Sequence, residues 1–250
     1  MTIDHTEAEK RRYFRNLMLP EVGAAGQKRF QAAGAAVVGA GGIGSAALYY
    51  LAAAGVGRVA IIDGDAVELS NLQRQILHGV RDLGKPKADS AREALLALNP
   101  HLGVQALNVR VHKGNILEIL HGYDIILDAS DNFETRLLLG DYCWKARTPL
   151  VSAAAAGFHG LLLVMAPGPG NPCYRCLLPQ PPAPAPEEGI LGAVAGVMGC
   201  LQAVEALKLI LGRKSELTRR LLAYDGLKGR FQSLARPQRP DCPLCGEKTQ

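Results

Sequence analysis

Four closely spaced glycines, in Gly39-Ala-Gly-Gly-Ile-Gly44, follow an apolar run at 35–38 and precede small apolar residues at 45–54. A strand, a glycine turn and a helix in this order are typical of phosphate binding. Glycine lets the backbone approach a phosphate closely, and the helix N-terminus presents free N–H groups. The pattern predicts that Gly39, Gly41, Gly42 and Gly44 bind a nucleotide. Taken alone it leaves NAD or FAD as the default ligand, and a plain glycine turn as the structural alternative.

Polar residues after the next strand favour a nucleoside triphosphate. Asp63 ends the apolar run at 59–62, where a carboxylate can accept hydrogen bonds from ribose hydroxyls. Arg74 lies in the following polar loop, within Asn71-Leu-Gln-Arg-Gln75, and Lys87 opens the next expected helix. Fixed cations beside a glycine loop suit a triphosphate that loses pyrophosphate, whereas hydride transfer does not need them. A pair of solvated surface charges is the alternative for Arg74 and Lys87.

A third group of polar residues, Asp128-Ala-Ser-Asp131-Asn132, closes another expected strand and opens a helix. Parallel sheets place ligands at the carboxyl ends of their strands, so we expect Asp131 to lie near Gly39 and Asp63. A carboxylate there can bind Mg²⁺ directly or through water and so bridge ATP oxygens. The alternative is that Asp131 only caps the helix.

Four of the six cysteines form two C-x-x-C pairs, Cys173/Cys176 and Cys242/Cys245. Four soft ligands in tetrahedral geometry suit a closed structural Zn²⁺ site, which would hold the C-terminal tail to the second half of the chain. Redox-active C-x-x-C pairs are the rival interpretation, but two pairs far apart in sequence favour a shared metal. Cys143 and Cys200 fall inside helical patterns and are expected to be buried, inert thiols.

The elements that must position these residues alternate between strand and helix in the first half. Strands are expected at 35–38, 59–62, 104–111 and 124–128, and helices at 45–54, 88–98 and 132–145. In the helix at 88–98, Ala88, Ala91, Leu95 and Leu98 share one face. The alternation predicts an α/β fold: a Rossmann-type, mainly parallel sheet with helices on both faces.

The second half has a different pattern. Short strands are expected at 150–152, 161–165, 221–224 and 231–234, which would extend the sheet with antiparallel strands. Leu201, Val204, Leu207 and Leu211 mark a helix that ends at Gly212. The proline-rich segment Pro179–Pro186 is expected to be a mobile or polyproline-like loop, because proline cannot continue a helix or a central strand.

Charge and hydropathy narrow the class of protein. The N-terminal residues 1–15 are polar and no apolar run reaches the ~18–20 residues of a membrane span, so we expect a cytoplasmic protein that neither crosses nor binds a membrane. The net charge is +5, and the segment 213–239 carries eight basic residues against two acidic ones. That segment is either a solvated surface or a docking face for an acidic partner. Nucleic acid is a weaker option, since no aromatic interleaving accompanies the charge.

Taken together, these landmarks resemble the MoeB/ThiF/HesA family of E1-like adenylyltransferases. The matches run in family order along nearly all of the chain. They are Arg12-Tyr-x-Arg15, the glycine loop, Asp63-x-Asp65, Asn71-Leu-Gln-Arg-Gln75, Lys87, Asp131-Asn132, the two cysteine pairs and Gly196-Val-Met-Gly199. The resemblance implies one domain over 1–250, with an N-terminal arm at 1–30, a nucleotide-binding half at 31–150 and a carrier-binding, zinc-clipped half at 151–250.

The resemblance also implies roles. Such an enzyme uses ATP and Mg²⁺ to adenylylate the C-terminal carboxylate of a ubiquitin-like sulfur carrier protein ending in Gly-Gly. By analogy Arg74 and Lys87 stabilise the phosphates and Asp131 organises Mg²⁺. Arg15 reaches into the neighbouring subunit's site, so a homodimer is required. The nucleotide-binding residues implied are Gly39, Gly41, Gly42, Gly44, Asp63, Asp65, Asn71, Arg74, Lys87, Asp131 and Asn132.

The chain departs from the family pattern in two places and leaves two rival functions. Many relatives carry a cysteine in the loop at 179–189, but this chain has none and Ala185 or a neighbour replaces it. We therefore expect adenylylation without a covalent intermediate through that loop, more in keeping with molybdopterin than with thiamin synthesis. Asn16 stands where relatives often have Gln and should be tolerated. The rivals are an NAD(P)-dependent Rossmann oxidoreductase and a non-enzymatic zinc-stabilised scaffold.

Overall fold

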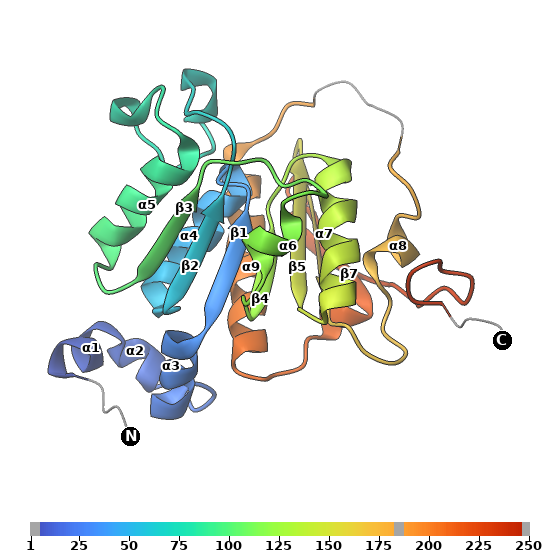
Figure 1. Ribbon diagram of the computed structural model, residues 1–250, viewed down its shortest axis with the longest axis horizontal. Helices are drawn as coiled ribbons and strands as arrows, with labels where there is room; N and C mark the ends of the chain where they lie inside the picture. The colour runs from blue at the N-terminus through green and yellow to red at the C-terminus, as the bar shows by residue number, and fades with distance from the viewer. Residues whose placement is uncertain (1–5, 183–187, 247–250) are drawn as a thin grey trace.

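One sheet, in the order β3-β2-β1-β4-β5-β6-β7-β8, organises the computed structural model, which describes residues 6–182 and 188–246 (Figure 1). β1 pairs in parallel with β2 and β4, β2 with β3, and β4 with β5. β6, β7 and β8 continue the sheet in antiparallel pairing. The predicted Rossmann-type sheet with an antiparallel extension is therefore confirmed.

The strands are β1 (Gly34–Val38), β2 (Arg58–Ile62), β3 (Gly103–Leu107), β4 (Ile125–Asp128), β5 (Leu150–Ala156), β6 (His159–Met165), β7 (Arg220–Asp225) and β8 (Arg230–Ala235). The α-helices are α1 (Glu7–Arg12), α2 (Phe14–Leu17), α3 (Gly23–Ala32), α4 (Gly42–Ala54), α5 (Lys87–Leu98), α6 (Ile116–Leu120), α7 (Phe133–Ala146), α8 (Tyr174–Leu177) and α9 (Gly192–Ile210). Short 3₁₀ turns are η1 (Leu69–Asn71), η2 (Val80–Asp82) and η3 (Glu216–Thr218).

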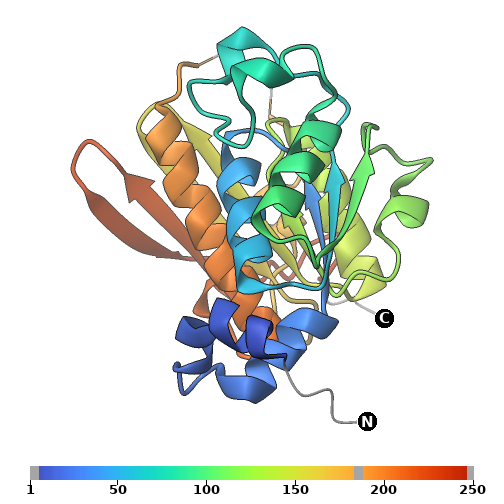
Figure 2. The same ribbon diagram turned by 90° about the vertical axis from the view of Figure 1, so that its left-hand side faces the viewer.

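Both faces of the parallel sheet are buried, which explains its continuous apolar strands. Alternate residues of β1 enter two separate cores, Ala35 and Val37 on one face and Ala36 and Val38 on the other. Helices α4, α5 and α9 cover the first face, where α4 and α9 lie side by side (Figure 2). Helices α6 and α7 and the cysteine-bearing segments cover the second.

The strand order creates the switch point at which α/β sheets bind ligands. From β1 the chain moves to β2 and β3 on one side, and then returns to β4 on the other side of β1. The loops after β1 and β4 therefore leave in opposite directions at the carboxyl edge, opening a crevice between them. The segment between β2 and α5 lies above the same edge (Figure 1).

Element boundaries differ from the expected ones mainly where tertiary contacts decide them. β3 ends at Leu107, short of the expected residue 111, and β5 and β6 are longer than expected because they pair along seven residues. Leu98 and Val204 belong to the apolar patterns that predicted α5 and α9, and they are 39% and 51% exposed.

Helix α9 has the length and apolar composition to cross a bilayer, alone among the helices of the described residues. It instead packs against α4 and against β4, β5 and β6, with Val194, Met198 and Ala206 buried. Close approach to α4 requires glycine at Gly199, since a Cβ there would lie 2.2 Å from the carbonyl oxygen of Ile43. The apolar composition of α9 is therefore that of a helix packed on a sheet.

The N-terminal arm, α1 to α3, lies at the amino end of the parallel strands (Figure 1). Asn99, at the end of α5, donates to the Tyr13 hydroxyl at 2.9 Å, and Arg12 donates to the carbonyl of Leu98. Asn16 donates to Gln27 at 3.1 Å, so asparagine finds a partner within the arm. Of the proline-rich loop, residues 183–187, including Ala185, lie outside the described residues.

Candidate active site

The glycine loop turns tightly between β1 and α4. Gly39 has φ +98°, and a Cβ there would lie 2.6 Å from the carbonyl oxygen of Ala129. A Cβ at Gly44 would lie 1.9 Å from the carbonyl oxygen of Gly39. Only glycine fits either position, because one needs a left-handed backbone and the other a backbone-to-backbone contact. The turn leaves Gly41 as the N-cap of α4, with no side chain satisfying the first N–H groups of the helix.

Arg74 and Gln75 lie against this loop. The Cβ position of Gly42 is 3.4 Å from Cγ of Arg74, and that of Gly41 is 3.7 Å from Nε2 of Gln75. Arg74 is half-buried, and its guanidinium donates only to the carbonyl of Ser70 at 3.1 Å, counting partners among the described residues. The aliphatic part of Arg74 therefore packs at the start of α4, and its guanidinium has no carboxylate partner among the described residues.

Lys87 and the two aspartates after β2 form a second group at this edge. Nζ of the buried Lys87 lies 3.2 Å from Oδ2 of Asp65, whose other oxygen accepts from Arg110 at 2.7 Å. Burial opposes ionisation of Asp65, but Lys87 and Arg110 outweigh it and lower the pKa of this carboxyl. Asp63 accepts from the backbone N–H of Ala40 at 2.8 Å and so connects the group to the glycine loop.

Asp131 lies exposed just beyond β4, and its neighbour caps the helix. Asn132 is the N-cap of α7, with its side chain accepting from the N–H of Thr135 at 2.8 Å. Among the described residues, the carboxylate of Asp131 receives only a weak hydrogen bond, from Nδ2 of Asn132 at 3.4 Å. The capping alternative for Asp131 is therefore wrong. Asn132 caps α7 in the structure, and its predicted contact with the nucleotide stays a prediction.

A buried polar network that sequence reasoning missed holds the segment leading to Asp131. Asp128 is fully buried, and its carboxylate accepts from the hydroxyls of Ser130 and Ser152, both at 2.6 Å. Arg136 donates to the carbonyls of Ser130 and Ala153. In the sequence this network could have been suspected from Asp128 and Asp131 at the end of one strand, followed by Arg136 on the next helix. The network fixes the backbone from which Asp131 projects.

Ser152→Ala should destabilise the fold by about 1–3 kcal/mol, because it leaves a buried carboxylate oxygen of Asp128 without its donor. The measurement is urea unfolding followed by circular dichroism. Ser45→Ala is a matched control, because Ser45 is also buried and, among the residues that the structure describes, its side chain makes a single 3.4 Å contact, with the N–H of Leu77. Equal effects of the two variants would show that Ser152 does not support a charged Asp128.

His78 is a second buried residue that sequence reasoning missed. Its Nε2 lies 3.0 Å from the carbonyl oxygen of Ala40, and its Nδ1 lies 2.9 Å from the hydroxyl of Ser90 in α5. A carbonyl can only accept, so Nε2 donates to it, and a neutral ring leaves Nδ1 to accept from Ser90. Burial and the nearby Lys87 lower the pKa of His78 and favour this neutral form. His78 thus joins the glycine loop to the helix that carries Lys87.

The glycine loop thus contacts Arg74, Asp63 and the Ala129–Ser130 segment that precedes Asp131, while the contact of Arg74, Lys87 and Asp131 with one common ligand stays a prediction. Asn71 lies in the same loop, but its side chain accepts from the N–H of Glu68 at 3.2 Å and supports η1. Arg15 is the exception. It is exposed on α2, at the opposite end of the sheet from the glycine loop (Figure 1). A cavity of about 370 Å³ also lies at that opposite end, lined by Arg29 and Asp124.

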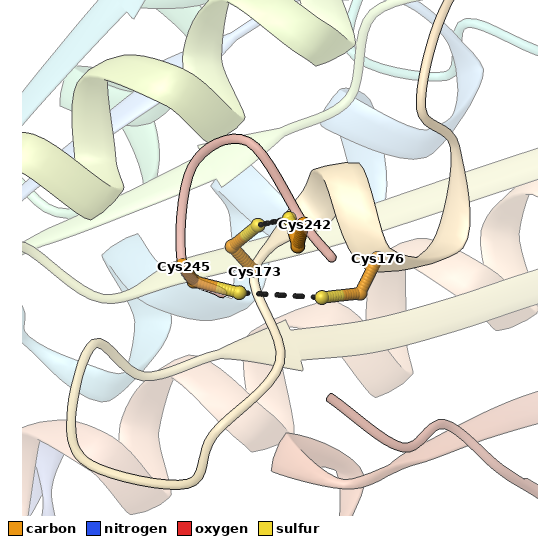
Figure 3. Close-up of side chains that lie close together, drawn as sticks. All are labelled: Cys173, Cys176, Cys242 and Cys245. Atoms are coloured by element: carbon orange, nitrogen blue, oxygen red, sulfur yellow. Dashed lines mark hydrogen bonds between the residues drawn. The ribbon is translucent and has the colours of Figure 1, made fainter. Parts of the chain in front are cut away.

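The four paired cysteines converge from segments 69 residues apart in sequence (Figure 3). Cys173 and Cys242 have sulfur atoms 3.4 Å apart, Cys176 and Cys245 have theirs 3.3 Å apart, and all four sulfurs lie within 4.8 Å of one another. These separations exceed the S–S bond length of about 2.05 Å and bracket the roughly 3.8 Å expected around tetrahedral zinc. The cluster can hold a metal ion.

The remaining cysteines differ in exposure. Cys143 is fully buried in α7, and burial raises the pKa of its thiol, as expected for an inert residue. Cys200 is only half-buried in α9, so its predicted burial was overstated, although burial raises its pKa as well.

Within the four-cysteine cluster, burial opposes ionisation of Cys242, but the N–H groups of Cys245 and Leu244 lower its pKa to about 7. A low pKa favours the thiolate form that binds metals.

Known proteins are similar in sequence to this chain along nearly its whole length. The model of the ThiF family matches residues 13–244. The chain is 44% identical to the SAMP-activating enzyme E1 of Haloferax volcanii, covering 99% of this chain and 92% of that protein. It is 46% identical to the sulfur carrier protein adenylyltransferase of Thermus thermophilus, covering 97% and 93%. It is also 46% identical to the adenylyltransferase and sulfurtransferase MOCS3 of Mus musculus, but spans only 53% of that longer protein.

Solved structures agree on the fold. The Escherichia coli MccB structure superposes with a TM-score of 0.84 at 21% identity, covering 99% of this chain and 75% of MccB. MccB with AMPCPP and MccA gives 0.81 at 24% identity over 94% and 74%. None of these relatives is named as an oxidoreductase, so the NAD(P) alternative is not supported. With the family model spanning 13–244 and relatives near 45% identity along its full length, this chain belongs to the ThiF family.

Proposed function

We propose that this protein is an ATP-dependent enzyme that adenylylates the C-terminal glycine carboxylate of a ubiquitin-like sulfur carrier protein and releases pyrophosphate. The observation that carries the proposal is the contact of the glycine loop with Arg74, with Asp63 beside the Asp65–Lys87 pair, and with the Ala129–Ser130 segment that leads to Asp131. The close relatives named as adenylyltransferases and as an activating enzyme support the same reaction.

In the proposed reaction, a carboxylate oxygen of the carrier's last glycine bonds to the α-phosphorus of ATP. The bond from that phosphorus to the bridging oxygen breaks, and pyrophosphate leaves with the electron pair. The N–H groups at the start of α4 bind phosphate oxygens, while Arg74 and Lys87 stabilise the charge that develops on pyrophosphate. Asp63 and Asp65 hold the nucleotide, and Asp65 also keeps Lys87 in place. Catalysis then consists mainly of positioning and charge stabilisation.

Asp131 is the residue we propose to hold Mg²⁺. Its carboxylate is exposed, is nearly free of hydrogen bonds among the described residues, and follows a segment fixed by the Asp128 network. Hard oxygen ligands of this kind suit Mg²⁺, which also keeps bound water and substrate phosphates. When bound, the ion neutralises charge on the triphosphate.

The four-cysteine cluster is proposed to bind structural Zn²⁺ in a closed site. Cys173 directly precedes α8, and Cys176 lies within it. Cys242 and Cys245 lie in the C-terminal tail. A shared ion would join these two segments against the core that contains Cys143. A closed four-thiolate site leaves no open position for substrate, so its contribution is to stability.

We further propose a homodimer in which Arg15 completes the partner's site. Within one chain Arg15 lies at the wrong end of the sheet to meet its own glycine loop. Exposed apolar side chains surround it on the arm, with Phe14 57%, Met18 59% and Leu19 50% exposed. An apolar surface of this kind is typical of a subunit contact.

The absence of cysteine from 179–189 supports adenylylation alone, in the molybdopterin branch or alternatively in thiamin synthesis.

The proposal predicts exchange of labelled pyrophosphate into ATP that requires both Mg²⁺ and an added carrier protein ending in Gly-Gly. A carrier lacking its last glycine is the matched control and should give only background exchange. Thermal shift should show stabilisation by ATP with Mg²⁺ and none by NAD. Exchange that is absent with every carrier tested, despite ATP binding, would indicate a scaffold that has lost the chemistry.

A further inference from the structure

Arg236 is a buried cation without a buried acid. It is 3% exposed, although the sequence placed it in a basic surface segment. Arginine is almost never fully buried unless it is paired, because removing its charge from water is costly. Among the described residues, no carboxylate forms an ion pair with Arg236. The prediction that the whole segment 213–239 is a solvated or docking surface is therefore wrong at this position.

The hydrogen bonds of Arg236 go to peptide carbonyls alone, within the part of the chain that the structure describes. Nη1 donates to the carbonyls of Pro172 and Cys173, both at 3.2 Å, and Nη2 donates to those of Val164 and Thr218 at 2.7 and 2.6 Å. Its Nε has no partner among the described residues. The four carbonyl groups accept from most of the N–H groups of Arg236, but they carry no net negative charge. The guanidinium still needs a counter-charge.

Two neighbouring arginines have the carboxylate partner that Arg236 lacks. Arg175 forms a two-pronged pair with Asp141, at 2.9 and 2.6 Å, and Arg239 pairs with Asp241 at 2.8 Å. Arg175 stands between Cys173 and Cys176 in sequence, the backbone N–H of Arg239 donates to Sγ of Cys176, and Arg236 donates to the carbonyl of Cys173. Of these three arginines only Arg236 lacks a carboxylate partner among the described residues. Burial lowers the pKa of Arg236, and the thiols of Cys176 and Cys173 oppose that change. Because Arg236 also donates to the carbonyl of Cys173, the thiols of the cluster are neighbouring groups that can supply negative charge.

We infer that Arg236 is the charge partner of the metal-loaded cysteine cluster and raises its affinity for zinc. Four thiolates around Zn²⁺ carry a net charge of about −2, which a buried guanidinium can offset. The same side chain donates to the carbonyl of a ligand residue, Cys173, and to β6 through Val164, and so connects the cluster to the sheet. This inference rests on the zinc site proposed above. It adds a positioning residue outside the four ligands.

The test compares variants of the full-length protein by competition for zinc with a chromogenic chelator at fixed pH. Arg236→Gln should weaken zinc binding by about 10–100-fold, since it removes the charge but keeps a hydrogen-bond donor. Arg236→Lys keeps the charge and should bind within about five-fold of the unchanged protein. Arg239→Gln is the matched control. It removes a charge near the same cysteines at an exposed position and should also stay within about five-fold.

Each outcome supports or overturns the inference. Equal losses in the Gln and Lys variants would overturn it, because they would assign the effect to the hydrogen-bond fork. Unchanged affinity in Arg236→Gln would overturn it as well. If Arg236→Gln does not fold, Arg236→Lys decides alone: retained affinity supports charge pairing, and a loss above about ten-fold contradicts it. Failure of the unchanged protein to bind zinc would instead reject the zinc site itself, leaving the adenylylation proposal standing.

Discussion

Asp131→Ala should abolish pyrophosphate exchange, with a loss of at least about 100-fold, while leaving the fold intact. The expected loss is large because the variant removes the carboxylate proposed to hold Mg²⁺ beside the triphosphate. The fold should survive because the side chain is exposed and receives only the 3.4 Å contact from Asn132 among the described residues. Exchange at saturating carrier and thermal unfolding of the same preparation measure the two effects.

Asn132→Ala provides the opposite control one residue away. It removes the N-cap of α7 and should cost about 1 kcal/mol of stability, with a much smaller loss of exchange than Asp131→Ala. The neighbouring pair therefore separates chemistry from capping within a single loop. A large stability loss in Asp131→Ala with exchange largely retained would contradict the assignment of Mg²⁺ to Asp131.

Arg15→Ala and Lys87→Ala should each be nearly inactive alone, yet a refolded equimolar mixture should regain about a quarter of the unchanged activity. Half of the dimers in such a mixture are mixed, and each mixed dimer holds one site with both an intact Lys87 and a partner Arg15. The reason is positional, since Arg15 lies at the far end of the sheet from its own glycine loop. Pyrophosphate exchange before and after mixing is the measurement.

A mixture of Arg74→Ala with Lys87→Ala is the control for this experiment. Both residues belong to the same edge of the same chain, so mixing them should restore no activity beyond the sum of the two. Recovery in that control would mean that the subunits share sites in some other way. No recovery in the Arg15 mixture, with mixed dimers demonstrated by mass, would remove Arg15 from the partner's site.

The arrangement at the carboxyl edge has a consequence for mutational studies of this family. Lys87, Asp65 and Arg110 form one chain of charges, and His78 ties the glycine loop to the same helix. Effects of substitutions there are expected to be non-additive, because removing one partner redistributes the others. The activity lost in a single variant of these residues will therefore reflect the whole charge network and not one side chain.

Some of the site was predictable because its requirements are local. The glycine loop demands glycine within one turn, since a Cβ at Gly44 would lie 1.9 Å from the carbonyl oxygen of Gly39. The cysteine pairs demand a two-residue spacing that few other functions need. Alternating strands and helices then place the loops after β1, β2 and β4 on one edge by connectivity alone. Such signals are complete within a few residues of sequence.

Other features depended on partners far along the chain. Which of Asp131 and Asn132 caps α7 was decided by backbone geometry at the helix start, since both residue types cap equally well. The burial of Arg236 depends on carbonyls up to 72 residues away, and that of Asp128 on Ser152, 24 residues on. The sequence alone therefore determined the fold class, the nucleotide loop and the cysteine pairs able to bind a metal. The tertiary structure decided which charged side chains are buried and what holds them, because burial is a property of packing between distant segments.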